Sequence, residues 1–136
     1  MAAADGNEPI ADDEILYRRI FYDYYQPGSD RPVSWVAFRP TEHDGDGLSV
    51  WRAKYVTLAK AGAGRPGKSY FVAVLHAEDL RRLGCDLMPT PDSGRGHASI
   101  TNMSWCAYAE SKNTVRSLSE MIAAQCTDRV EGPFPE

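Results

Sequence analysis

The central stretch of the chain decides the fold that we predict. It reads Val33-Ser34-Trp35-Val36-Ala37-Phe38-Arg39-Pro40, then the turn Asp44-Gly45-Asp46-Gly47, then Leu48-Ser49-Val50-Trp51. β-Branched and aromatic residues favour extended structure, and Asp and Gly are typical of turns. We therefore predict two short strands, Ser34 to Phe38 and Leu48 to Trp51, joined by a polar loop at the centre of a mixed domain.

Further elements on both sides of this pair indicate an α+β fold. Additional strands are expected at Ile15–Ile20, Ser69–Leu75 and His97–Thr101, with a short extended segment at Cys85–Met88 and short helices at Lys54–Ala61 and Ala77–Leu83. The best helix is Ser111 to Cys126, because Val115, Leu118 and Ile122 recur at helical spacing. The fold class predicted is a small mixed or antiparallel sheet with a long C-terminal amphipathic helix packed on it. Seven residues are expected to be buried together: Leu48, Val50, Phe71, Ala73, Leu75, Leu118 and Ile122.

A length of 136 residues suits one domain. We expect residues 1–13 to be a disordered lead, residues 14–126 the globular domain and residues 127–136 a loose tail, because the two ends are polar or rich in Gly and Pro. The N-terminus lacks the basic and apolar regions of a secretory signal. Three cysteines without a close pair are typical of reduced thiols, so we predict a cytoplasmic protein.

The charge balance limits the ligands. The formal net charge is −4, from 19 acidic and 15 basic side chains. Non-specific binding to nucleic acid needs a basic surface, so it is not expected here. Arginines are nevertheless concentrated in the first half of the chain, which would allow a local positive potential: Arg18, Arg19, Arg31, Arg39 and Arg52.

The segment His97-Ala98-Ser99-Ile100 carries the first candidate site. Alternate residues of a strand share a face, so His97 and Ser99 would lie side by side. A histidine beside a hydroxyl can move a proton and hold a phosphate, as in cyclic phosphodiesterases, where two H-x-[ST] units face each other. Only one such unit is present, since Ala77-Glu78 follows His76. The same pattern also fits a strand-end histidine with a purely structural hydrogen bond.

Arg18 and Ser49 form the second candidate site. They are similar to the Arg-Ser-Glu arrangement of ADP-ribosyltransferase-like folds, in which the acid would come from Glu78 or Glu110. No Ser-Thr-Ser or Glu-x-Glu pattern supports that resemblance. Arg18 as a surface residue and Ser49 as a hydroxyl at the edge of the core is the simpler interpretation.

No metal or cofactor is expected. The acidic loop Glu42–Gly47 offers oxygen ligands, but Tyr55 stands where an EF-hand needs its bidentate Glu, so a solvated turn fits better. Trp35, Trp51 and Trp105, with seven tyrosines, could stack on bases, although core packing explains them more simply.

The order of several short motifs resembles a group of small uncharacterised bacterial single-domain proteins. The motifs are Arg18-Arg19-Ile20, Ala37-Phe38, Leu48-Ser49-Val50 and His97-Ala98-Ser99-Ile100, followed by a C-terminal amphipathic helix. The resemblance would cover roughly residues 14 to 126. It implies a bacterial single-domain protein and no particular activity.

Two functions follow as hypotheses. The first is a cytoplasmic accessory protein that binds a protein partner, with Arg39, Trp35 and Trp51 as binding residues and no association with a membrane. The second is an enzyme acting on nucleotide or RNA phosphate, with four candidate catalytic residues: His97, Ser99, Arg18 and Ser49. A deep cleft lined by these residues would favour the enzyme, whereas an apolar groove would favour the binding module. The oligomeric state stays open.

Overall fold

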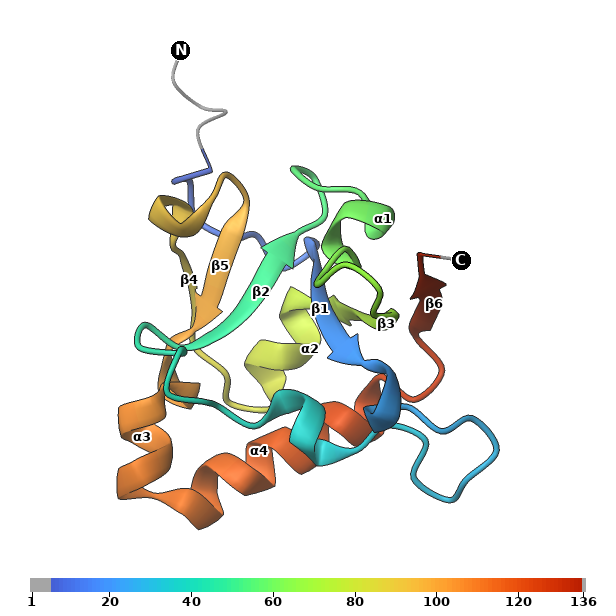
Figure 1. The fold of residues 1–136 in the computed structure, drawn as a ribbon. Coiled ribbons are helices and arrows are strands. Elements are labelled where there is room, and N and C mark those ends of the chain that lie inside the picture. The colour runs from blue at the N-terminus through green and yellow to red at the C-terminus, as the bar shows by residue number, and fades with distance from the viewer. Residues whose placement is uncertain (1–5, 136) are drawn as a thin grey trace.

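Six antiparallel strands form one open sheet in the order β4-β5-β2-β1-β3-β6 in the computed structural model, which describes residues 6–135 (Figure 1). The strands are β1 (Ile15–Phe21), β2 (Leu48–Arg52), β3 (Tyr70–His76), β4 (Leu87–Pro89), β5 (His97–Ile100) and β6 (Val130–Phe134). The α-helices are α1 (Leu58–Ala61), α2 (Ala77–Arg82), α3 (Trp105–Glu110) and α4 (Lys112–Gln125), and short 3-10 turns are η1 (Tyr22–Tyr24), η2 (Trp35–Phe38), η3 (Pro91–Ser93) and η4 (Thr101–Met103). The predicted α+β class with a long C-terminal helix is confirmed.

The predicted strand Ser34–Phe38 is wrong, because this segment is the 3-10 turn η2. The Ser34 side chain accepts a hydrogen bond from the Val36 N–H at 3.2 Å, which caps the turn. The buried Ser119 hydroxyl of α4 donates to the Phe38 carbonyl at 2.8 Å. Capping and packing against α4 therefore override the strand preference of Trp35, Val36 and Phe38.

The predicted helix Lys54–Ala61 is shorter in the structure. Only α1 is helical, because the Thr57 side chain accepts a hydrogen bond from the Lys60 N–H and fixes the N-terminus of the helix there.

Both ends of the described chain, which fall in the expected lead and tail, have contacts with the domain. Residues 6–9 are held because Arg52 donates to the backbone carbonyls of Gly6, Glu8 and Pro9. At the other end β6 pairs with β3 and completes the sheet. Residues 1–5 and 136 lie outside the described part of the chain.

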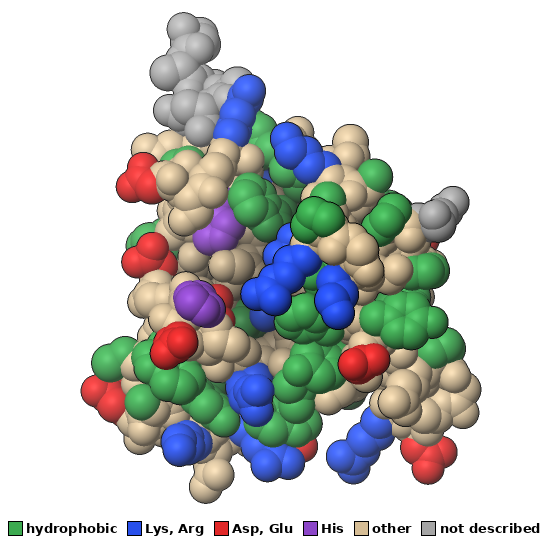
Figure 2. All heavy atoms as spheres, viewed as in Figure 1, with side chains coloured by type: hydrophobic (Ala, Val, Ile, Leu, Met, Phe, Trp, Pro, Cys, Tyr) green, Lys and Arg blue, Asp and Glu red, His purple; other side chains and the backbone are tan. Residues whose placement is uncertain are grey.

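β1 and β2 separate soon after they meet. Their pairing covers only Leu16 with Arg52 and Tyr17 with Trp51, and the two strands then diverge (Figure 1). β1 instead pairs along its full length with β3. Figure 2 shows basic, histidine and hydrophobic side chains gathered together near the middle of the face over this region.

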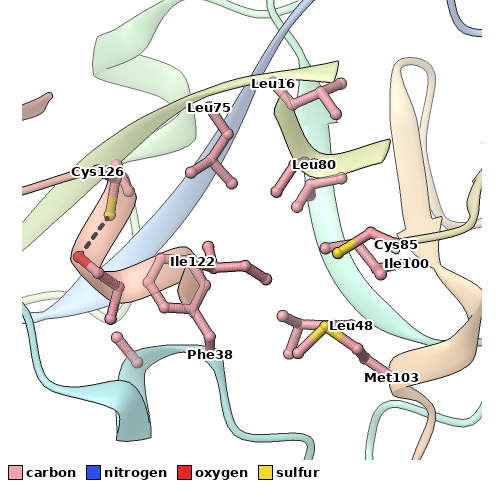
Figure 3. Close-up of a cluster of buried hydrophobic side chains, with 14 of the residues drawn as sticks. Leu16, Phe38, Leu48, Leu75, Leu80, Cys85, Ile100, Met103, Ile122 and Cys126 are labelled. Atoms are coloured by element: carbon pink, nitrogen blue, oxygen red, sulfur yellow. Dashed lines mark hydrogen bonds between the residues drawn. The ribbon is translucent and has the colours of Figure 1, made fainter. Parts of the chain in front are cut away.

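One apolar core lies between the sheet and α4 (Figure 3). Alternate residues of β1, β2 and β5 point into it, including the fully buried Leu16, Leu48 and Ile100. Phe38 from η2 and Ile122 from α4 close it from the helical side. All seven residues predicted to be buried together belong to this core, so that prediction is confirmed.

Candidate functional site

A recess of about 400 Å³ opens where β1 and β2 diverge. We call it the arginine recess. Its lining comprises Arg18, Arg19, Ile20, Phe21, Tyr24, Val36, Ala37, Arg39, Thr41, His43, Asp44, Ser49, Trp51, Arg65 and Tyr70. Four arginines from three separate segments thus surround one small cavity, whose size is ordinary for a small-molecule site.

Arg18 lies in the recess at the point where β1 and β2 diverge. Its Nε donates to the Ala37 carbonyl at 3.0 Å and its Nη1 to the Ser49 carbonyl at 2.9 Å, so its side chain bridges β1, η2 and β2 where main-chain pairing has ended. Burial lowers the pKa of Arg18 to about 10, against a smaller opposing effect of the Asp44 charge. Arg18 therefore stays cationic at neutral pH, held by neutral carbonyl groups.

The arginines of the recess, like Arg31 and Arg95 elsewhere, form no ion pair with a carboxylate of the described chain. In residues 6–135, ion pairs with carboxylates involve the following arginines: Arg52, Arg81, Arg82, Arg116 and Arg129. None of these lines the recess. Arg18, Arg19, Arg39 and Arg65 form no such pair within the described chain. The lining of the recess therefore carries four arginines and one carboxylate, that of Asp44, which leaves an excess of positive charge.

The loop Thr41–Gly47 forms one wall of the recess. The buried Asp44 carboxylate accepts hydrogen bonds from the Thr41 N–H at 2.7 Å and the Thr41 hydroxyl at 3.2 Å. Gly47 has a φ of +140°, and a Cβ there would overlap the backbone of Ile100. These two constraints hold the loop, and with it the exposed His43, against the edge of the recess.

A second cavity of about 420 Å³ shares His43, Ser49 and Trp51 with the first. We call it the histidine recess. Its lining comprises His43, Gly45, Asp46, Gly47, Ser49, Trp51, Ser93, His97 and Ser99. Register explains the grouping, because Ser49 lies opposite Ser99 and Trp51 opposite His97 in the β2–β5 pair.

Four side chains of β2, β5 and the segment before η3 form a hydrogen-bonded chain. His97 Nε2 is 3.0 Å from Ser49 Oγ, and His97 Nδ1 is 2.7 Å from Thr90 Oγ1. Thr90 Oγ1 is in turn 3.0 Å from Ser99 Oγ. The edge of the His97 ring also faces Trp51 at a centroid distance of 4.9 Å. Each hydroxyl can donate or accept, so the geometry accommodates either neutral tautomer of His97.

Burial lowers the pKa of His97, and the hydrogen bond with Thr90 and the charges of Asp46 and Asp44 oppose this effect only in part. His97 is consequently neutral at pH 7. A neutral imidazole with its proton on Nδ1 leaves Nε2 free to accept a proton from the Ser49 hydroxyl. The arrangement can therefore carry out acid–base chemistry beside a positively charged cavity.

The structure brings together most of the residues selected from the sequence. Arg18, Arg39 and Ser49 line the arginine recess, and Ser49, His97 and Ser99 line the histidine recess. Trp51 lies on the wall between them. The structure thus places these residues close together, and their functional roles are predictions.

Other selected residues lie elsewhere. Trp35 contacts Arg116 of α4, with the guanidinium 4.5 Å from the ring centroid, and lines a different groove. Neither Glu78 nor Glu110, the acids that the ADP-ribosyltransferase-like pattern would need, lines either recess. Glu78 instead pairs with Arg82.

Sequence reasoning missed two contributors. Arg65 lies in the loop between α1 and β3, and Thr90 lies between β4 and η3. Neither belongs to a motif, so only the fold relates them to the site. The Arg18-Arg19 doublet was the signal available in the sequence.

Within residues 6–135, no group of three or more His, Cys, Asp or Glu side chains is arranged to hold a metal ion. The helices of the same residues include none with the length and apolar character to cross a membrane. Comparisons of the chain with models of protein families, with curated proteins and with solved structures find no match.

Proposed function

We propose that the arginine recess binds a phosphate-bearing ligand. The observation that carries this proposal is the excess of positive charge in one cavity, where Arg18, Arg19, Arg39 and Arg65 lie around a single carboxylate, that of Asp44, and form no direct ion pair within the described chain. Buried charges in proteins are normally paired, because leaving them unpaired costs free energy. An anionic ligand would supply the missing charge, and the planar guanidinium group suits phosphate.

The surrounding residues support this assignment. Arg39 and Arg65 are exposed on the wall of the recess, and within the described chain the Arg39 guanidinium contacts only the Trp35 ring, at 6.0 Å from its centroid, so both guanidinium groups can approach a ligand without breaking an ion pair. The Ser49 side chain lines the same cavity, and its hydroxyl can donate to a phosphate oxygen. The net charge of −4 disfavours attraction to a long polyanion, so the group of arginines suits a small anionic ligand better.

Binding of inorganic pyrophosphate, measured by calorimetry at about 0.15 M salt, tests the proposal. Arg39→Gln should weaken binding about ten- to one-hundred-fold, because a hydrogen bond to a charged group contributes about 1.5–3 kcal/mol. Arg31→Gln removes the same charge from an exposed arginine outside the recess and is the matched control. Equal affinity of both variants, or no binding by the wild-type protein, would contradict the assignment.

A second candidate, catalysis on the bound phosphate, is favoured by one specific observation. Ser49 lines both recesses, and its hydroxyl lies 3.0 Å from His97 Nε2. Nucleophilic and general-base mechanisms both need a hydroxyl within such a distance of a neutral base. The enzyme hypothesis derived from the sequence is therefore kept as a proposal, with His97 as the base.

Turnover of phosphomonoester and phosphodiester substrates tests this second candidate. We expect activity that increases as pH rises through the pKa of His97, and that is lost in Ser49→Ala and His97→Gln while pyrophosphate still binds. Binding without turnover of either substrate class by the wild-type protein would instead identify a ligand-binding protein.

The protein-binding module also remains a prediction. The surface to test is an open groove between α4 and the segment before η2. Its lining includes Trp35 and the exposed Met121. Loss of partner capture on Met121→Lys, with pyrophosphate binding unchanged, would support it.

A further inference from the structure

One end of the arginine recess is aromatic. Phe21, Tyr24 and Tyr70 line it. Phe21 is the last residue of β1 and keeps 54% of its side chain exposed. The centroid of its ring lies 5.8 Å from that of Tyr24, edge to face, and 5.5 Å from that of Tyr70. These contacts hold the Phe21 ring at the cavity wall while leaving much of its surface open to a ligand.

Cationic and aromatic groups alternate along this wall. The Arg19 guanidinium lies 5.1 Å from the centroid of the Tyr70 ring, and Tyr70 in turn contacts Phe21. An isolated exposed phenylalanine needs no special explanation. Phe21 is different because it opens into the cavity whose floor is Arg18. The same recess therefore offers a flat apolar surface and a group of positive charges.

We infer that the ligand of the arginine recess is a single nucleotide, with its base against Phe21 and Tyr24 and its phosphate against Arg18 and Arg39. The inference rests on the proposed function. Aromatic side chains stack on any base, and arginine binds phosphate. A cavity of about 400 Å³ lies in the range of small-molecule sites, and a net charge of −4 disfavours attraction to a polynucleotide.

The experiment compares ligands that carry one or both parts of a nucleotide. The probes are inorganic pyrophosphate, ribose 5-phosphate, the four ribonucleosides and the four ribonucleoside 5′-monophosphates, each titrated calorimetrically into the full chain. We expect at least one monophosphate to bind about five- to one-hundred-fold more tightly than ribose 5-phosphate, because stacking adds to the phosphate contacts. The ribonucleosides should bind much more weakly than their monophosphates.

Variants of Phe21 test whether this residue causes the higher affinity for the monophosphate. Phe21→Ala should remove the advantage of the monophosphate over ribose 5-phosphate and leave the affinity for ribose 5-phosphate unchanged, whereas Phe21→Trp should preserve the advantage. Tyr22→Ala is the matched control, because Tyr22 is the next residue, is 56% exposed and contacts Phe71 without lining the recess. Since Phe21→Trp retains an aromatic ring, it keeps the test decisive should Phe21→Ala fail to fold.

The two levels of the proposal fail in distinguishable ways. Equal affinity for ribose 5-phosphate and all four monophosphates, or a monophosphate advantage that survives Phe21→Ala, would overturn the nucleotide inference and leave phosphate binding intact. Absence of binding by every phosphorylated probe would overturn the proposed function and the inference together.

Discussion

Replacing Glu14 by Gln should destabilise the protein strongly, because Glu14 faces the fully buried cation Arg52. Glu14 accepts two hydrogen bonds from Arg52, at 2.8 Å from Nε to Oε1 and 2.7 Å from Nη2 to Oε2. The other donors of Arg52 bond to the carbonyls of Gly6, Glu8 and Pro9. The Glu14→Gln side chain keeps its size and loses the charge, so the guanidinium would lose the carboxylate closest to it.

Breaking a buried ion pair by removing one partner costs about 3–5 kcal/mol. We expect the lower end of this range, about 3 kcal/mol, because Arg52 keeps its three carbonyl acceptors and a second carboxylate, that of Glu8, at 3.5 Å. With a urea m-value of about 2 kcal/mol/M, the unfolding midpoint would fall by roughly 1.5 M.

The assay is urea unfolding followed by tryptophan fluorescence and circular dichroism. Glu78→Gln is the control, because Glu78 and Arg82 form an ion pair in which both side chains are more than half exposed, and such pairs contribute at most about 1 kcal/mol. A midpoint for Glu14→Gln that differs from wild type no more than the control does would refute the reasoning.

The stability difference between wild type and Glu14→Gln should depend on pH. Burial acts to raise the pKa of Glu14, but hydrogen bonds from Arg52 and from the Ala11 N–H outweigh it, so the pKa lies below the ordinary value of 4.5. A carboxylate with a lowered folded-state pKa stabilises the protein above its unfolded pKa, and this contribution is lost as pH falls through the folded value. The difference in stability between wild type and Glu14→Gln should therefore be full at pH 6 to 7 and should shrink below about pH 4.5.

Three further predictions concern the core, the thiols and the histidine. Leu118→Ala should lower the free energy of unfolding by about 2–5 kcal/mol through lost burial and a residual cavity, while Met121→Ala, exposed on the same helix, should change it by less than about 0.5 kcal/mol. Cys106 is exposed and should react with a thiol reagent in the folded protein. Cys85 and Cys126 should react only on unfolding, because burial raises their pKa values to about 12. A mass showing an intramolecular disulfide would contradict this prediction. An NMR titration of His97 should give a pKa below 6.5, and a value above it would contradict the neutral imidazole.

The elements with the strongest local signals were predictable. The continuous apolar run of β3 and the helical spacing of α4 both form as expected, and the core residues they carry lie together. The segment at η2 was not predictable from strand preference, because the Ser34 cap and the bond from Ser119, 81 positions away in the chain from Phe38, decide its conformation. The partners of β6 and of the segment at residues 6–9 are likewise distant in sequence.

The sequence by itself determined which residue types were available for a site: the Arg18-Arg19 doublet, a Ser on β2, and a His and Ser alternating on β5. It also determined the alternation that puts His97 and Ser99 on one face. Only the tertiary structure decided that β1 and β2 diverge after two residue pairs, which leaves room for Arg18 and opens the recess. It alone brought Arg65 to that recess and Thr90 to the side chains of His97 and Ser99. The physical reason is that strand register and the closing of loops depend on contacts between distant segments, and local propensity carries no information about these contacts.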